Sequence, residues 1–146
     1  MHIDNQQDTL PLVPAGIAAE AGENGPVLTG GHCPHCRRDF FPRPRHCPQC
    51  LQPPEERPLS GDGVIYSYTV VRTRAPFGLP QPYAVGFIDL SQSGLRIFGL
   101  LNQSDIGRLA IGKAVRLRLG PLGVDGKGGP CRRPYFSLAE REGDDA

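Results

Sequence analysis

Four cysteines in the first third of the chain have a spacing that could bind a metal ion. They form two Cys-x2-Cys pairs, Cys33 with Cys36 and Cys47 with Cys50, and ten residues separate the pairs. A two-residue gap lets both sulfurs of one tight turn point at a common centre, and the second turn completes a tetrahedral set. The pattern therefore predicts a metal site made of four thiolates.

Two disulfides are the alternative use of these cysteines. Small secreted scaffolds are rich in disulfides, but they usually carry a secretory leader, and the chain begins MHIDNQQDTL without a basic and then apolar run. A cytoplasmic, reducing compartment is therefore expected. Such a compartment favours thiolate ligation of a metal over disulfide bonding.

Zinc in a structural role is the metal we expect in this site. Four thiolates leave no open position for water or substrate, and a catalytic zinc needs one. His32, His35 and His46 flank the cysteines and are not needed as ligands. Four thiolates also suit a single iron, so a rubredoxin-like electron carrier is an alternative.

Basic residues crowd the same stretch of the chain. Arg37, Arg38, Arg43 and Arg45 lie between or beside the two cysteine pairs. Four thiolates and one divalent cation carry a net charge of about −2, and part of the basic cluster offsets that charge. The rest could contact a phosphate-bearing ligand or an acidic partner surface.

The overall composition limits the size and class of the fold. With 146 residues, 38% of them hydrophobic, the chain is long enough for one modest domain and a small appendage. Its 19 glycines and 16 prolines favour short strands and turns over long helices. A net charge of +1 is not that of a typical nucleic-acid binder, and no apolar run approaches the roughly 18 residues of a membrane span.

The chain divides into four segments by its composition. We expect a partly ordered N-terminal segment at residues 1–26, a zinc ribbon with its linker at 27–59, an OB-fold domain at 60–139 and an acidic tail at 140–146. Within the first segment, residues 17–21 could form one or two helical turns. The proline-rich stretch from Gln52 to Leu59 is expected to be an extended connector.

The third segment contains five stretches with strand character, rich in β-branched and aromatic residues or alternating between apolar and polar ones. They are Val64–Arg74, Tyr83–Leu90, Leu95–Leu101, Ala114–Leu119 and Tyr135–Ala139. Five strands with a longer link after the third match an OB barrel better than a sandwich of about seven strands. The predicted fold is therefore mainly β, a rubredoxin-like zinc ribbon followed by a five-stranded OB-fold barrel.

The predicted barrel offers little for catalysis. All four histidines lie in the first 46 residues, and residues 61–138 contain no glutamate, so no paired carboxylates or Ser/His/Asp set can be proposed from spacing. Cys131 lies beside arginines that would favour its reactivity, but the barrel has no histidine to act as its base. The chain therefore reads as a binding or assembly module.

Two kinds of ligand fit the loops and strands of such a barrel. OB folds bind ligands with the face of strands two and three and with the loops after strands one and four, here residues 75–82 and 120–134. Single-stranded nucleic acid would need a basic groove and stacking aromatics; the aromatics available are Tyr66, Tyr68, Phe77, Tyr83, Phe98, Tyr135 and Phe136. Alternatively, Lys127, Arg132 and Arg133 could hold the phosphates of a nucleotide-like molecule.

Several short motifs occur in the order found in a known family. They are Cys33-Pro-His-Cys36, Phe41-Pro-Arg43, Cys47-Pro-Gln-Cys50, Leu59-Ser-Gly-Asp-Gly63, Val64-Ile-Tyr66, Pro82-Tyr83 and Ile111-Gly112-Lys113. Over residues 28 to 138 the chain resembles the zinc-ribbon plus OB-fold proteins that are associated with acyl-CoA enzymes. Within that family it is most similar to the small subunits of benzoylsuccinyl-CoA thiolases from anaerobic toluene breakdown.

The resemblance implies a non-catalytic subunit of a hetero-oligomer. Such subunits dock on thiolase-like enzymes, our first choice of partner, or on acyl-CoA hydratases of the hot-dog type, and they help to form the acyl-CoA site. Zinc would be structural, and the phosphates of coenzyme A would contact Lys127, Arg132 and Arg133. No nucleic acid and no membrane are expected among the partners.

Three features depart from the family pattern. Family members commonly have a helix before the first cysteine pair, whereas Pro and Gly interrupt residues 1–30 here. Glycine often follows the second cysteine of each pair, where it eases a positive φ; Arg37 and Leu51 take those places. A stretch of Gly and Pro at 120–134 replaces the short link expected before the last strand.

Overall fold

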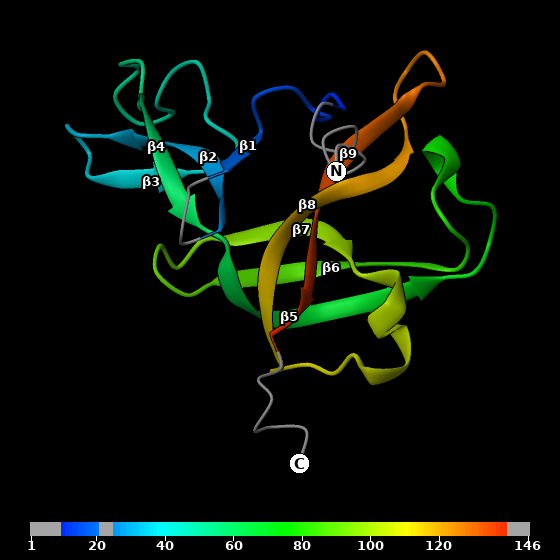
Figure 1. Cartoon of the computed structure of the whole chain (residues 1–146). Helices are drawn as coiled ribbons and strands as arrows, with labels where there is room; N and C mark the ends of the chain where they lie inside the picture. Colours follow the sequence, from blue (N-terminus) through cyan, green and yellow to red (C-terminus); the bar gives the residue numbers. More distant parts are fainter. Residues whose placement is uncertain (1–9, 21–24, 140–146) are drawn as a thin grey trace.

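The computed structural model describes residues 10–20 and 25–139. They form two β modules, a small four-stranded sheet and a closed five-stranded barrel, which lie against each other (Figure 1). The predicted acidic tail at 140–146 and residues 1–9 and 21–24 of the N-terminal segment lie outside the described residues. Among the residues described, no helix has the length and apolar character needed to cross a membrane.

The small sheet is built around β2 (Pro26–Cys33). Along one edge β2 pairs with β4 (Glu55–Ser60), and it also pairs with β1 (Ala18–Glu20) near its start and with β3 (Arg38–Phe40) at its end. The helical turns expected at residues 17–21 are therefore wrong for the part described. There the backbone of β1 bonds to β2, and Ala18 packs in the core opposite Leu28.

The expected connector between the modules is instead largely a strand. Residues 55–60 form β4, which pairs with β2 from Val27 to His32. Proline is tolerated in β4 because it is an edge strand and Pro58 need not donate a hydrogen bond on its free side. Only Gly61 separates β4 from the first barrel strand, so the two modules are joined without a flexible linker.

The barrel follows the order β5-β6-β7-β9-β8. Its strands are β5 (Asp62–Val71), β6 (Tyr83–Leu90), β7 (Arg96–Leu101), β8 (Ala114–Val124) and β9 (Pro130–Leu138). A parallel pairing of β7 with β9 closes it, and the other pairings are antiparallel. The predicted five-stranded OB barrel is thus confirmed.

The long glycine- and proline-rich loop predicted at residues 120–134 is wrong. β8 and β9 continue as a hairpin as far as Val124 and Pro130, with an irregularity in register between Pro121 and Val124. The connecting turn is short because the Asp125 carboxylate accepts hydrogen bonds from the backbone N–H groups of Lys127 and Gly129. These hydrogen bonds lower the pKa of Asp125.

One apolar core joins the two modules. Inward side chains of the barrel, among them Ile65, Ile88 and Leu117, pack in the same cluster as Leu28 of β2 and Leu59 of β4. Each of these side chains is at most 4% exposed, and full burial of such a residue stabilises the fold by about 2 kcal/mol. The ribbon is therefore held to the barrel by packing as well as by the chain itself.

Within residues 10–20 and 25–139, two short 3-10 helices lie in the loops. η2 (Pro76–Gly78) is part of the loop between β5 and β6, and η3 (Gln103–Arg108) follows β7. The Asn102 side chain caps η3. The buried Asp105 carboxylate accepts hydrogen bonds from the Leu138 backbone N–H and the Arg108 guanidinium, so η3 is fixed to β9.

Candidate metal centre and barrel surfaces

The four cysteines of the predicted metal site lie together at the tip of the small sheet. Their Sγ atoms all lie within 4.8 Å of one another, with Cys33 at 3.5 Å from Cys50 and Cys36 at 3.8 Å from Cys47. A tetrahedral zinc with Zn–S bonds of about 2.3 Å places its sulfurs about 3.8 Å apart. The donor set and its spacing therefore fit one zinc ion.

Two equivalent turns present the sulfurs. In the first, the Arg37 N–H donates to the Cys33 carbonyl at 2.6 Å, and in the second the Leu51 N–H donates to the Cys47 carbonyl at 2.7 Å. Arg37 has φ 57° and Leu51 has φ 67°, a conformation that costs a side-chain-bearing residue about 1–2 kcal/mol. Arg37 and Leu51, at the positions where the family often has glycine, thus adopt the positive φ that glycine would ease.

The electrostatics of the cluster favour a cation at its centre. Burial and hydrogen bonding to neighbouring thiols raise the pKa of Cys36 to about 12, whereas the backbone N–H groups of Cys50 and Gln49 lower that of Cys47 to about 6. The Cys47 thiol therefore ionises readily, whereas the Cys36 thiol resists ionisation beside it. A coordinated divalent ion removes this conflict because it deprotonates its thiol ligands.

His32 is engaged away from the sulfurs. Its Nδ1 lies 2.8 Å from Asp39, and the Arg57 guanidinium also contacts that carboxylate at 2.8 Å. Although partial burial raises the pKa of Asp39, the hydrogen bonds from His32 and Arg57 outweigh it and hold the pKa below its usual value. This cluster ties β2, β3 and β4 together beside the metal site, in agreement with the view that His32 is not a ligand.

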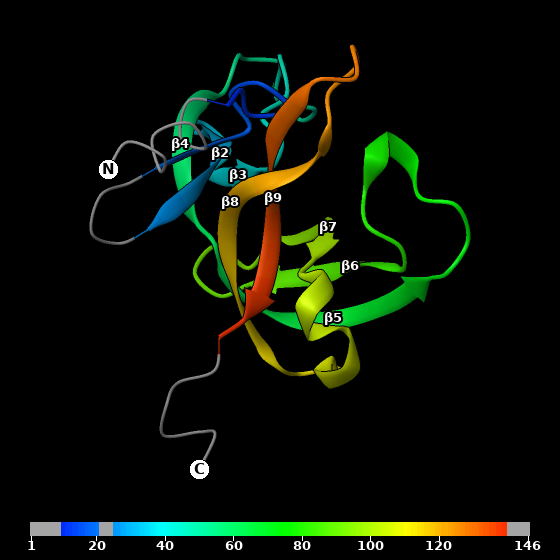
Figure 2. The same cartoon turned by 45° about the vertical axis from the view of Figure 1, so that its right-hand side comes forward.

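The two loops that OB folds use for ligands meet on one side of the barrel. The β5–β6 loop and the tip of the β8–β9 hairpin project from the same end of the barrel (Figures 1 and 2). They are in contact, since a Cβ at Gly123 would lie 2.5 Å from the Phe77 carbonyl oxygen. The sequence predicted the loop at residues 75–82, whereas the hairpin stands in place of the loop predicted at residues 120–134. The tertiary structure brings the two together.

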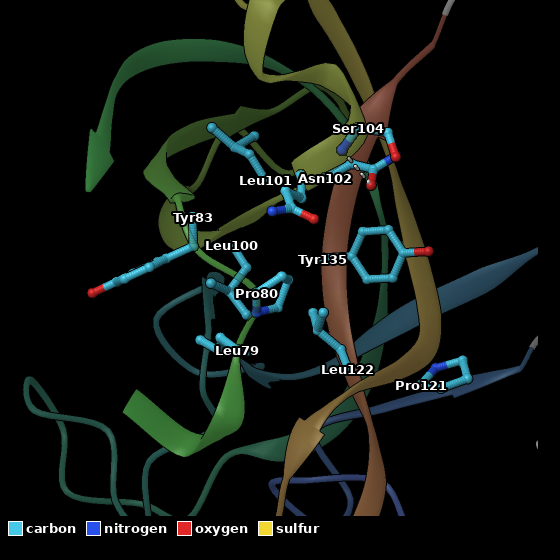
Figure 3. A pocket seen from close by; sticks show the side chains of 11 residues that line it. Leu79, Pro80, Tyr83, Leu100, Leu101, Asn102, Ser104, Pro121, Leu122 and Tyr135 are labelled. Carbon is cyan, nitrogen blue, oxygen red and sulfur yellow. Dashed lines mark hydrogen bonds between the residues drawn. The ribbon is translucent and has the colours of Figure 1, made fainter. Parts of the chain in front are cut away.

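A pocket of about 150 Å³ opens between these loops and the end of β7 (Figure 3). Leu79 and Pro80 come from the first loop, Leu122 from the hairpin, and Leu100 from β7. The lining also includes the polar residues Asn102, Gln103 and Ser104 and the ring of Tyr135, whose hydroxyl points away from the pocket (Figure 3). The pocket suits a small apolar group with a polar edge, and Leu79, Leu100 and Leu122 were not among the residues singled out from the sequence.

Aromatic side chains also gather on the outer surface of β5, β6 and β7. Tyr66, Phe87 and Phe98, which we call the aromatic face, are all exposed. Phe87 lies opposite Phe98 in the register, with ring centroids 5.3 Å apart in an edge-to-face arrangement. The Arg96 guanidinium lies 3.3 Å from the centre of the Tyr66 ring and makes two hydrogen bonds to Asp89.

Tyr66 and Phe98 were among the aromatics singled out from the sequence, whereas Phe87 was not. The signal that could have found it is the alternation in β6, where Phe87 lies between the inward residues Gly86 and Ile88. A large apolar side chain on the outward position of a strand is the informative observation.

Comparison with known proteins places the chain in a family. A sequence model described as the C-terminal OB-fold domain of ChsH2 matches residues 56–120. A DUF35 domain-containing scaffold protein from Methanothermobacter thermautotrophicus is 32% identical over 105 residues, which cover 70% of this chain and 78% of the relative. The chain belongs to the DUF35 family.

Two further matches agree with DUF35 membership. A DUF35 domain-containing scaffold protein from Methanocaldococcus jannaschii is 34% identical over 112 residues, 74% of this chain and 78% of the relative. A chain of the solved structure described as "Ltp2-ChsH2(DUF35) aldolase" matches with a TM-score of 0.63 and 25% identity, over 78% of this chain and 86% of that one. The resemblance to zinc-ribbon plus OB-fold proteins is thereby confirmed.

The three residues predicted to hold phosphates lie on the β8–β9 hairpin of this DUF35 chain. Lys127 is exposed at the turn of the β8–β9 hairpin. The Arg132 guanidinium donates to the Leu10 carbonyl, and the buried Arg133 guanidinium donates to the Leu122 carbonyl and contacts the Cys131 sulfur at 3.2 Å. Both arginines thus have internal partners, and Cys131 is buried beneath them.

Proposed function

We propose that the chain is a non-catalytic scaffold subunit of an acyl-CoA-processing complex. It docks on a thiolase-like enzyme, or as second choice on a hot-dog acyl-CoA hydratase, and helps to shape the acyl-CoA site of that enzyme. The names of its relatives as scaffold proteins support this role, as does the likeness to a chain of the Ltp2-ChsH2(DUF35) aldolase. A 2-benzoylsuccinyl-CoA thiolase of aromatic degradation is the complex we favour.

The observation that carries the proposal is the aromatic face. Exposed phenylalanine and tyrosine side chains grouped on one surface mark interaction sites, because each loses unfavourable contact with water when a partner covers it. The bidentate Arg96–Asp89 ion pair holds the Arg96 guanidinium over the Tyr66 ring. This rigid arrangement lowers the entropy lost on docking.

The metal site serves the same role at a distance from the chemistry. Cys33, Cys36, Cys47 and Cys50 would hold one structural zinc, which supplies no reaction step because four thiolates complete its coordination. Its effect is to hold β2, β3 and the segment before β4 in one arrangement. Since Leu28 and Leu59 of that sheet pack into the barrel core, a stable ribbon also steadies the barrel.

The pocket beside the β5–β6 loop is the surface we assign to the acyl part of the substrate. A dry cavity of about 150 Å³ accommodates benzene, so the volume suits a phenyl-sized group. Leu79, Leu100 and Leu122 would contact that group, and Asn102 lies at the polar edge. The reacting groups belong to the partner enzyme.

Replacing Phe87 and Phe98 together by serine is expected to weaken binding of the partner enzyme by at least about 100-fold, because two exposed aromatic anchors are lost. The chain's stability should change little, since both rings are exposed. The measurement is co-purification from cells that co-express a thiolase-like enzyme, followed by a binding titration.

Phe77 provides a matched control for this variant. Phe77 and Phe98 are each 59% exposed, but Phe77 lies on the β5–β6 loop, outside the aromatic face. Phe77→Ser should leave the affinity near that of the wild type. Equal affinity of all three proteins for the enzyme would show that the aromatic face is not the docking surface.

Single-stranded nucleic acid is a second candidate ligand for the same surface. OB folds bind such strands on this face with stacking aromatics, and Phe87 and Phe98 lie on β6 and β7. The electrostatics are less favourable, because Asp89 already neutralises Arg96. Oligonucleotide binding with a steep salt dependence would favour this function over docking on an enzyme.

A further inference from the structure

A second concave site lies on the ribbon, away from the barrel pocket. Arg43, Pro44 and Arg45, which precede the second cysteine pair, form one side, and Pro53 and Pro54, which precede β4, form the other. The cleft has a volume of about 340 Å³. Its walls are stiff, because proline fixes φ at three of its five lining residues.

The position of Arg43 is set by a close approach to β2. A Cβ atom at Gly31 would lie 2.6 Å from Cγ of Arg43 and 3.1 Å from its Cβ. Only glycine leaves room for the aliphatic part of this side chain to lie on the strand. The stem of Arg43 is therefore fixed against the sheet, and less freedom is lost when its guanidinium binds a ligand.

Neither guanidinium in the cleft has an ion-pair partner within the described part of the chain. Arg43 and Arg45 make no hydrogen bond or ion pair there, not even with Glu55 at the start of β4 or with a cysteine sulfur. By contrast, Arg57 and Arg96 are each paired with an aspartate. Two unpaired positive charges that line one rigid cleft favour an anion between them.

We propose that this cleft binds the phosphate-bearing end of coenzyme A. The planar guanidiniums of Arg43 and Arg45 match phosphate oxygens in a bidentate manner, and the proline rings offer flat apolar walls to the adenine. The choice of coenzyme A among phosphate-bearing nucleotides rests on the proposed function. This cleft is an alternative to the hairpin site of Lys127, Arg132 and Arg133, where both arginine guanidiniums have internal partners.

Adenosine 3′,5′-bisphosphate is the probe that tests the cleft in the full chain without its partner. Calorimetric titration should give one saturable site, with inorganic pyrophosphate as a weaker competitor. The double variant Arg43→Gln/Arg45→Gln should bind at least about tenfold more weakly, because it loses charge-assisted hydrogen bonds to phosphate. Zinc content and circular dichroism show whether the variant is folded.

Arg72 and Arg74 give a matched control on the barrel. They have the same spacing and are also exposed, so Arg72→Gln/Arg74→Gln changes the net charge equally and should leave the affinity unchanged. The proposal would be wrong if both double variants lost the same affinity for adenosine 3′,5′-bisphosphate, or if the folded wild type showed no saturable binding. A loss of affinity seen only in Lys127→Gln would also contradict the proposal, because it would place the phosphates at the β8–β9 hairpin. Binding of the partner enzyme is measured in a separate experiment. Failure of the phosphate site can therefore be distinguished from failure of the proposed scaffold function.

Discussion

Removal of the metal ion by a strong chelator at neutral pH is expected to unfold the ribbon. The small sheet has few buried side chains of its own, and a structural zinc contributes on the order of 10 kcal/mol to such a module. Hydrogen exchange should accelerate in β2, β3 and β4, whereas the inner strands of the barrel should stay protected. Cys36→Ser should have the same effect, because it removes one ligand.

Cys131→Ser is the control for the cysteine variant. Cys131 is buried in the barrel, away from the four clustered sulfurs, so this change should leave one zinc per chain by elemental analysis. Full protection of the ribbon after chelation would contradict a structural metal. A red protein with iron and visible charge-transfer absorption would instead support the rubredoxin-like electron carrier.

Gly86→Ala is expected to destabilise the barrel by about 3 kcal/mol, because the new methyl group cannot be accommodated without moving the backbone. A Cβ at Gly86 would lie 2.3 Å from the Ser67 carbonyl oxygen and 3.0 Å from the Tyr68 Cβ, next to the irregularity in register between Ile65 and Ser67. Equilibrium unfolding in denaturant measures the loss.

Gly126→Ala is the comparison variant, because nothing lies within 4 Å of a Cβ at Gly126. Its free energy of unfolding should stay within about 0.5 kcal/mol of the wild type. If the two variants proved equally stable, the crowding at Gly86 would be relieved by a movement of β5, and the close packing of β5 on β6 would not be a constraint on the fold.

The sequence by itself determined the candidate metal site and the type of fold. Cys-x2-Cys spacing acts within a single turn, so the geometry of each cysteine pair is a local property that neighbouring residues set. Strand alternation is local too, which is why β6 was placed at Tyr83–Leu90 from the sequence. The family motifs between residues 28 and 138 carried the link to scaffold proteins.

Long-range pairing decided what the sequence could not. Ala18–Glu20 and the segment around Pro58 became strands because β2 offers them backbone partners, which outweighs weak local preferences. Arg132 and Arg133 were predicted as phosphate ligands, and the fold gives their guanidiniums internal carbonyl partners, Leu10 of the N-terminal segment for Arg132 and Leu122 of β8 for Arg133. The aromatic face, the barrel pocket and the Arg43–Arg45 cleft each join residues from separate segments, so only the tertiary structure could place them together.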